Sequence, residues 1–205
     1  MTAAPPGRRV RPGRPRSRSS HSPLEPREQI LRAAAELFSR QGIGATRLAD
    51  VAAAVGLTPP ALYYHFANLG EIVGALLEYV VSESAAFATT MARGAGRPSE
   101  RLRALVAQHV ARLAAGPYDL WFVAGMPEAD RNRYPTVTRR AVAWRRAVAD
   151  LIDEGVAAGE LRDVDRALAV AAISGLVYGA LQHHHHGHVV DPELIAELVV
   201  RSLAS

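Results

Sequence analysis

Residues 46–66, TRLADVAAAVGLTPPALYYHF, decide the fold of this chain. Four apolar residues of the first half recur at the spacing of one helix face: Leu48, Val51, Ala52 and Val55. Thr46 is of the type that caps such a helix, and Gly56 ends it. Thr58 caps a second, short helix, whose first turn accepts the two following prolines because N–H groups have no partner there. Two short helices joined by a glycine-led turn form the helix-turn-helix pattern.

The second short helix has an inner and an outer side. Leu62 and Phe66 are four residues apart, which places both on the inner side. Five residues remain on or near the outer surface: Pro60, Ala61, Tyr63, Tyr64 and His65. Such a helix enters the major groove of DNA, so this outer side is the candidate contact surface. The alternative is that the three rings pack at the junction with the next helix.

A further helix precedes this pair. Five apolar residues lie on one stripe of it: Ile30, Leu31, Ala34, Leu37 and Phe38. The segments that follow one another here are Ile30-Leu31-Arg32-Ala33-Ala34, Leu37-Phe38, Gly42, Thr46, Asp50-Val51-Ala52, Val55-Gly56-Leu57 and Leu62-Tyr63-Tyr64-His65-Phe66. Through them, residues 27–77 resemble the TetR family of bacterial repressors. The remaining residues are similar to that family only in their helical layout.

The resemblance implies a role for each matching position. Four residues would face base edges and make mostly apolar contacts: Pro59, Pro60, Ala61 and Tyr64. Tyr63 and His65 would contact phosphates, and Thr58 belongs to the same contact set. Thr46 and Arg47 would present a helix N-terminus and a guanidinium to the DNA backbone.

Positive charge is concentrated before this domain. All 24 basic residues are arginine and six of them lie in the first 24 residues without an acid, so the other 181 residues carry −2 of the total of +4. Residues 25–68 hold four arginines and four acids and are therefore neutral. Two positions also depart from the family: Leu69 replaces its usual lysine, and Ala49 stands where some members carry an arginine.

The arginine-rich segment, residues 1–24, is predicted to be a disordered arm because it has too few large apolar residues to bury. Phosphate neutralisation is the main source of affinity that does not depend on DNA sequence, and the neutral domain lacks it. We therefore expect the arm, with Arg14 and Arg16, to bind the backbone or the adjacent minor groove. The alternative is a solubilising tail.

Helical periods continue to the end of the chain, and no alternating stretch predicts a sheet. The predicted fold is all-α with about nine helices. Asn68 and Glu71 form an Asn-led capping box at the start of a long helix, Ser99 is expected to begin the next helix, and residues 128–133 are expected to be a charged loop. It divides into the arm, a helix-turn-helix domain over residues 25–70, and a helical ligand-binding and dimerisation domain over residues 71–205. No grouping of residues typical of an active site, a phosphate loop or a cofactor site stands out, so we expect no enzyme and no cofactor.

The second half also holds the candidate ligand site. Seven large residues cluster in its middle: His109, Tyr118, Trp121, Phe122, Met126, Trp144 and Tyr178. Each of them taken alone suits a core position, but together they suit a mostly apolar cavity. The resemblance implies such a cavity, with a small-molecule effector that changes the spacing of two DNA-binding domains. With little positive charge directed inward, the effector is expected to be hydrophobic or weakly polar.

The last two helices are the candidate dimer interface. Gly175 and Gly179 give the first of them a small-residue face, and the second ends the chain with an apolar stripe. The family pattern places both in a four-helix bundle between two subunits. Two recognition helices related in this way would read a pseudo-palindromic operator in double-stranded DNA.

Five histidines near the C-terminus are unusual: His183, His184, His185, His186 and His188. They are interpreted as a solvated connector between the last two helices, so no metal site is assigned. The competing hypothesis is a metal-responsive regulator that senses through them, because imidazole is a common ligand of transition metals. A third hypothesis is a helical interaction protein whose tail binds polyanions without sequence preference.

The composition excludes several other classes. Zero cysteines exclude a disulfide scaffold, a thiolate nucleophile and a cysteine-ligated metal site. The longest apolar stretch, residues 167–181, is too short to span a bilayer, and the N-terminal arginines precede no apolar signal region. The composition therefore predicts a soluble, cytoplasmic protein. The resemblance implies that it is a homodimeric DNA-binding regulator, a repressor that an effector releases.

Overall fold

The structure, a computed structural model, describes residues 24–124 and 126–205. This part of the chain forms ten helices and no strand, which confirms the all-α prediction. The helices are α1 (Pro26–Gln41), α2 (Leu48–Ala54), α3 (Pro59–His65), α4 (Leu69–Arg93), α5 (Pro98–Ala114), α6 (Trp121–Ala124), α7 (Glu128–Arg131), α8 (Pro135–Ala157), α9 (Arg166–His185) and α10 (Pro192–Leu203). One more helix forms than the sequence predicted, because α7 lies in a segment expected to be a charged loop.

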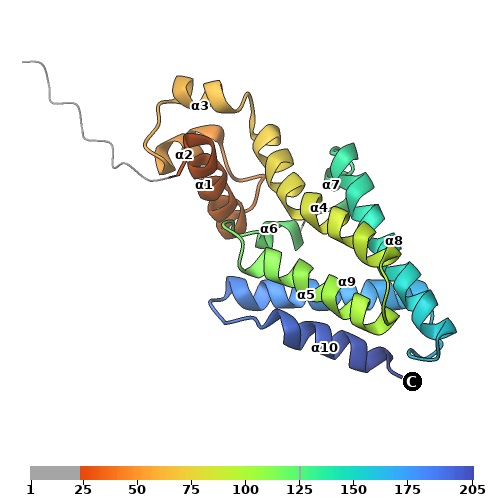
Figure 1. Cartoon of the computed structure of the whole chain (residues 1–205). Coiled ribbons are helices and arrows are strands. Elements are labelled where there is room, and N and C mark those ends of the chain that lie inside the picture. The colour runs from red at the N-terminus through yellow and green to blue at the C-terminus, as the bar shows by residue number, and fades with distance from the viewer. Residues whose placement is uncertain (1–23, 125) are drawn as a thin grey trace, which may run out of the picture.

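The helices are arranged as a small N-terminal group and a larger bundle (Figure 1). Helices α1, α2 and α3 gather at one end of the molecule, and α4 leads from them into the bundle. There α4 and α5 pack against α8, and α9 packs against α5 and α8. Helix α10 covers α5 and α9 from the outside, and the C-terminus lies at the end of the molecule away from α3.

Buried apolar side chains hold the N-terminal group together. Ile30, Phe38, Val51 and Leu62 come from α1, α2 and α3, and each is at most 1% exposed. The same core continues into α4 through Ile72. The inner residues predicted from spacing are confirmed as core, except that Leu48 and Val55, at the two ends of α2, are only partly buried and pack against this core.

The cap predicted for α2 is wrong. Helix α2 begins one residue later than expected, with Arg47 as its N-cap. The Thr46 hydroxyl turns away from α2 and donates to the carbonyl of Gly42 at 2.8 Å, and Thr46 is 5% exposed. The carboxylate of Asp50 instead accepts the Arg47 N–H at 2.8 Å, which satisfies one N–H group at the start of α2.

Helix α4 starts at a capped turn and joins the two groups of helices. The side chain of Asn68 accepts the Glu71 N–H at 3.0 Å, and the Glu71 carboxylate accepts the Ala67 N–H at 2.9 Å. The sequence predicted an Asn-led capping box; the glutamate reaches one residue further back than such a box requires. This stretch at the start of α4 therefore fixes the direction in which α3 is held.

Helix α4, and not residues 167–181, is long and apolar enough to cross a membrane by length and composition. Of its most apolar window, 44% is buried inside the structure. Its buried residues, such as Leu76 and Leu77, pack in the shared core with α5 and α8. Contact with these helices accounts for the apolar composition of α4.

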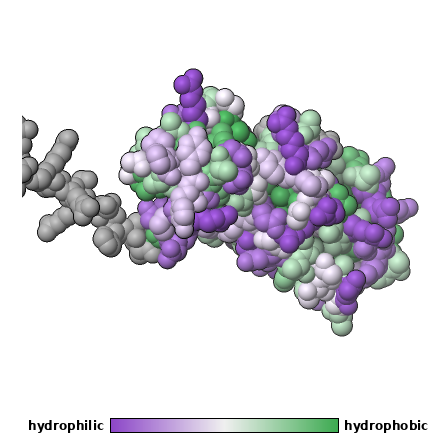
Figure 2. Space-filling model, turned by 90° about the horizontal axis from the view of Figure 1, so that it is seen from above, coloured by the Kyte–Doolittle hydropathy of each residue, from purple (hydrophilic) through white to green (hydrophobic). Residues whose placement is uncertain are grey.

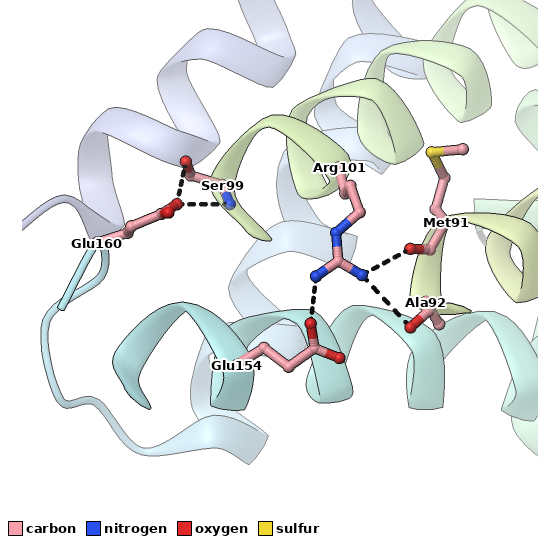
Figure 3. Close-up of polar contacts among 6 residues, drawn as sticks. All are labelled: Met91, Ala92, Ser99, Arg101, Glu154 and Glu160. Atoms are coloured by element: carbon pink, nitrogen blue, oxygen red, sulfur yellow. Dashed lines mark hydrogen bonds and ion pairs between the residues drawn. The ribbon is translucent and has the colours of Figure 1, made fainter. Parts of the chain in front are cut away.

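Polar contacts fix one end of the bundle (Figure 3). The Arg101 guanidinium, on α5, donates to the carbonyls of Met91 at 3.1 Å and Ala92 at 3.4 Å, and also pairs with Glu154 on α8. These carbonyls belong to the last turn of α4, where carbonyl groups outnumber the N–H groups that can bind them. The Met91 carbonyl also accepts the Gly94 N–H at 3.3 Å. One side chain therefore joins the ends of three helices.

The start of α5 also differs from the prediction. Ser99 was expected to begin this helix, but the helix begins at Pro98, and Ser99 lies in its first turn. Its N–H and hydroxyl donate to Glu160 Oε2, at 3.1 and 2.6 Å (Figure 3). The Ser99 hydroxyl is also the main reason why the pKa of Glu160 lies below its usual range. A carboxylate distant in sequence thus supplies the cap.

Candidate DNA-contacting surface and ligand cavity

Helix α3 turns a fixed set of side chains outward. Tyr63 is 57% exposed and Tyr64 86% exposed, whereas Leu62, between them and the core, is fully buried. Pro59 and Pro60 are exposed as well. The alternative that these two tyrosines pack at the junction with α4 is therefore wrong. An exposed aromatic surface on a helix anchored by buried leucine is suited to a groove or a partner.

The remaining predicted contact residues are divided between the surface and the core. Ala61 and His65 are half-buried, and the rings of His65 and Tyr64 meet edge-on with centroids 5.3 Å apart. Thr58 is exposed and accepts the Ala61 N–H at 3.4 Å, as its predicted role as cap requires. Arg47 is exposed at the start of α2, but Thr46 is buried and offers no surface for contact.

Charges around α3 are sparse. The Arg27 guanidinium lies 4.9 Å above the ring of Phe66, and Arg32 pairs with Glu28 at 3.4 Å. Among the side chains that the structure describes, Arg40 and Arg47 have no ion-pair partner. In the view from above, the end of the molecule formed by α1, α2 and α3 has a large pale and green area, with purple side chains at its edges (Figure 2). Arg14 and Arg16 lie outside the described residues.

A cavity of about 80 Å³ opens between α4, α5, α8 and α9. Its apolar wall consists of Val80, Val81, Leu113, Val123, Ala141, Val177 and Leu181. Its polar or aromatic residues are Ser84, His109, Trp144, Arg145, Ser174 and Tyr178. Three of the seven predicted ligand residues, His109, Trp144 and Tyr178, are thus brought together here.

His109 is the titratable group inside this cavity. Its Nδ1 and the Ser84 Oγ form a hydrogen bond of 2.8 Å, and its ring lies against Trp144 with centroids 4.7 Å apart. Part of the ring faces the cavity, yet burial from solvent, together with Arg112, lowers the His109 pKa to about 4. The imidazole is therefore neutral near pH 7, and the interior of the cavity carries no charge from it.

The other four predicted ligand residues lie elsewhere. Trp121, Phe122 and Met126 line a separate hollow beside α1, together with Phe38. Tyr118 lines a third one, with its ring edge-on to Tyr79 at 4.8 Å. The sequence placed all seven in one cluster because they are close along the chain or alike in size. Trp121 and Phe122 on the short helix α6 face the hollow beside α1, however, whereas Val123 of this helix lines the cavity.

This second group of residues connects α1 with the bundle. The Ser39 hydroxyl, on α1, donates to the Asp119 carbonyl at 3.3 Å and accepts the Phe122 N–H at the same distance. The Asp119 carboxylate in turn lies 2.9 Å from Nδ1 of His185, on α9. A chain of hydrogen bonds therefore runs from α1, in the N-terminal group of helices, through Asp119 to α9.

Helices α9 and α10 expose an apolar surface on their outer side. The exposed apolar residues there include Leu168, Leu176, Leu194 and Leu198, which are between 39% and 69% exposed. A groove of about 620 Å³ runs between the two helices past Gly175 and Gly179. No atom lies within 4 Å of a side chain built on either glycine. The small-residue face predicted for this helix is thus open to a neighbour.

The prediction that the five histidines form a connector between the last two helices is wrong for three of them. Helix α9 extends through His183, His184 and His185, and only then does the chain turn at His186 and Gly187. The rings of His183 and His188 stack with centroids 4.2 Å apart. In the described ranges, no group of three or more His, Asp or Glu side chains is placed to hold a metal ion.

Three polar residues of the cavity are absent from the sequence prediction: Ser84, Arg145 and Ser174. The signal for Ser84 was present, because it follows Val80 by four residues on the apolar stripe of α4. The sequence held no signal for Arg145, because this residue follows the inward Trp144 and belongs by its spacing to the outer, charged side of α8. Only the packing of α8 beside α9 brings it to the cavity.

Sequence comparisons agree with this architecture. A family model described as "Bacterial regulatory proteins, tetR family" matches residues 30–76, and one described as "Tetracyclin repressor-like, C-terminal domain" matches residues 95–204. The HTH-type transcriptional regulator TtgR of Pseudomonas putida is 43% identical over 61 residues, which is 30% of this chain and 29% of TtgR. The chain thus matches less than a third of that relative's length. The HTH-type transcriptional repressor KstR2 of Mycobacterium tuberculosis is 25% identical over 179 residues, 83% of this chain and 87% of KstR2.

Solved structures extend the likeness to nearly the whole chain. AmtR of Mycobacterium smegmatis is 31% identical and superposes with a TM-score of 0.77 over 90% of this chain and 88% of AmtR. AibR, solved in complex with isovaleryl coenzyme A and operator DNA, is 21% identical, with a TM-score of 0.68 over 87% of this chain and 98% of AibR. At that identity the second likeness concerns the fold alone.

Proposed function

The chain belongs to the TetR family of bacterial regulatory proteins, and we propose that it is a ligand-responsive DNA-binding repressor of transcription. The observation that carries the proposal is the outer side of α3, where Tyr63 and Tyr64 are exposed while Leu62 holds the helix to the core. A rigid helix with exposed aromatic and apolar side chains is suited to base edges and thymine methyl groups in the major groove.

The proposed contacts follow the positions of these residues. Pro59, Pro60, Ala61 and Tyr64 face base edges, and Tyr63 and His65 contact phosphates. Thr58 caps the recognition helix, and Arg47 contacts the backbone at the start of α2. Thr46 is dropped from this set because it is buried, with its hydroxyl bound to the Gly42 carbonyl. The arm, with Arg14 and Arg16, supplies the phosphate neutralisation that residues 25–68 lack.

The proposed assembly is a homodimer through α9 and α10. The exposed leucines of these helices and the open groove at Gly175 and Gly179 support it, because a soluble chain rarely leaves a contiguous apolar surface uncovered. A twofold axis between two copies relates two recognition helices, so the operator is a pseudo-palindrome.

The proposed effector site is the cavity that contains His109, Trp144 and Tyr178. Helix α9 lines this cavity with Val177 and Tyr178, and its opposite face borders the open groove with Gly175 and Gly179. An effector that shifts α9 would therefore act on the dimer and, through Asp119 and Ser39, on α1. An effector releases the operator if it binds more tightly to the dimer conformation in which the spacing of the two recognition helices does not fit DNA.

Selection of binding sites from random duplex DNA with two tyrosine variants tests the proposal. Tyr64→Ala removes a proposed base contact and is expected to abolish the enrichment that the wild-type chain gives. Tyr178→Ala, also at a partly exposed tyrosine but in the cavity, is expected to select the wild-type site. If Tyr64→Ala selected the same site with unchanged affinity, α3 would not be the recognition helix.

A further inference from the structure

The cavity between α4, α5, α8 and α9 is asymmetric in charge. Arg145 is the one charged side chain among the residues that line it, and no carboxylate lines it. Arg145 is exposed, and it makes no ion pair with any side chain in the described part of the chain. Its neighbour Arg146 is equally exposed but does not line the cavity. The cavity therefore has an unpaired guanidinium at its solvent side.

The interior of the cavity offers no such charge. His109 is neutral near pH 7 because its pKa is lowered to about 4, and its Nδ1 is engaged with Ser84. The Ser174 hydroxyl donates to the Val170 carbonyl of its own helix at 2.9 Å, so it is also engaged. A charged group of a ligand placed at this depth would lose its water without a partner charge. A ligand with a charge must keep it at the solvent side.

We infer that the cavity takes a small amphipathic monocarboxylate, whose apolar body lies among Val80, Val177 and Leu181 and whose carboxylate binds Arg145 at the solvent side. A planar guanidinium matches a carboxylate with two parallel hydrogen bonds. Tyr178, which is 39% exposed, lines the same cavity. A cationic ligand would meet Arg145 without any acid to balance it.

The size of the cavity limits the apolar body. Its volume of about 80 Å³ is about half of the roughly 150 Å³ of an engineered apolar cavity that holds benzene, so it encloses only the terminal carbon atoms of a short alkyl chain. The carbon atoms next to the carboxylate then lie at the opening, beside Arg145. Hexanoate is a suitable probe, and hexanamide is its uncharged counterpart of nearly the same shape. This inference rests on the proposed function, because it names the class of effector for the site proposed there.

Calorimetric titration with both probes tests the inference on the full-length chain at one ionic strength. The wild-type chain is expected to bind hexanoate about five- to tenfold more tightly than hexanamide, as a partly exposed ion pair allows. Arg145→Gln is expected to reduce hexanoate binding to the level of hexanamide and to leave hexanamide unchanged. Arg146→Gln, the matched control, is expected to behave as wild type. Ala141→Leu places extra carbon atoms on the apolar wall and is expected to weaken both probes.

Several results would overturn the inference. These are equal affinity of the wild-type chain for both probes, no hexanoate binding, the same loss in Arg145→Gln and Arg146→Gln, or unchanged hexanoate binding in Ala141→Leu. Binding of each sample to a duplex selected by the wild-type chain separates this failure from failure of the proposed function. A chain that binds the duplex but not hexanoate overturns only the carboxylate assignment, whereas failure to select any duplex overturns the proposed function.

Discussion

His109 shows how one residue can serve both the cavity and the stability of the bundle. It lies on α5 with Ser84 on one side and the Trp144 ring on another, and burial is the largest cause of its lowered pKa. An unfolded histidine binds a proton near pH 6.5, whereas His109 in the folded chain does so only near pH 4. Between these two values the unfolded state holds more protons, so acidification favours unfolding.

We predict that His109→Gln lowers the pH sensitivity of folding. The free energy of unfolding of the wild-type chain should fall as the pH is lowered from 6.5 to 4, and the histidine's share is up to about 3 kcal/mol. Glutamine takes up no proton, so the variant should lose less over this window. Denaturant unfolding at pH 7.5, 5.5 and 4.5 at fixed protein concentration measures the difference. His188→Gln, at an exposed position, is the control and should keep the wild-type slope.

At the scale of single residues, the sequence predicted which side of a helix a residue faces better than it predicted the group to which a side chain binds. Tyr64 is exposed and Leu62 buried, as their spacing indicates. Thr46 was misassigned because a threonine before a helix suits both a cap and a bond to the preceding turn, and only the fold decides between them. Arg145 was missed because a long side chain on the outer side of a helix can still reach a cavity that another helix completes.

Arg101 is the clearest case of a side chain that acts at the scale of helices. It is 9% exposed, and it holds the last turn of α4 and Glu154 of α8 from its own place on α5 (Figure 3). Its removal takes a donor from the Met91 and Ala92 carbonyls and leaves Glu154 without its ion pair. The side chain that joins α5 to both α4 and α8 is then lost, whereas the hydrogen bonds between Ser99 and Glu160 remain.

Arg101→Met is therefore expected to lower the free energy of unfolding by about 2–4 kcal/mol. Arg103→Met is the matched control on the same helix, because its pair with Glu193 is largely exposed and should change the free energy by at most about 0.5 kcal/mol. Denaturant unfolding of both variants measures the difference. Equal effects would show that the buried guanidinium does not join the three helices.

The first and last residues of a helix were predictable where the sequence itself holds the residue that starts or ends the helix. Gly42 ends α1 with φ 82°, and Asp191 caps α10 through two N–H groups. The start of α5 was less predictable, because its cap comes from Glu160, which is 61 residues away from Ser99. The sequence also contained no sign of α7, a helix of four residues in a charged segment. Such short helices depend on tertiary contacts more than on their own periodicity.

At the scale of the whole molecule, we propose that the outer surface of α9 and α10 determines assembly. We predict that Leu176→Glu, at the open groove, converts the chain to a monomer and weakens its binding to a selected duplex. Val142→Glu is the control, because Val142 is similarly exposed, at 49%, but lies on α8 away from the groove. Sedimentation measures the oligomeric state of both variants, and titration measures their binding to the duplex. A Leu176→Glu chain that remained dimeric would place the interface on another surface.

The distribution of charge leads to a further prediction for the whole chain. Deletion of residues 1–22 removes six arginines and no acid. If the arm contacts phosphates, affinity for DNA should fall and the slope of log affinity against log salt should become shallower by as much as about 5. Titrations at several salt concentrations measure this slope. An unchanged affinity and slope would leave the arm as a solubilising tail.

The most direct test of the proposed function is selection from random duplex DNA by the purified wild-type chain, at near-physiological salt and with excess non-specific competitor. We predict enrichment of an inverted repeat, whose half-sites are separated by about one helical turn or a multiple of it. No enrichment, with binding that disappears as the salt concentration rises, would contradict it. The arginine arm would then be the main source of affinity, and α3 would not be a reader of DNA sequence.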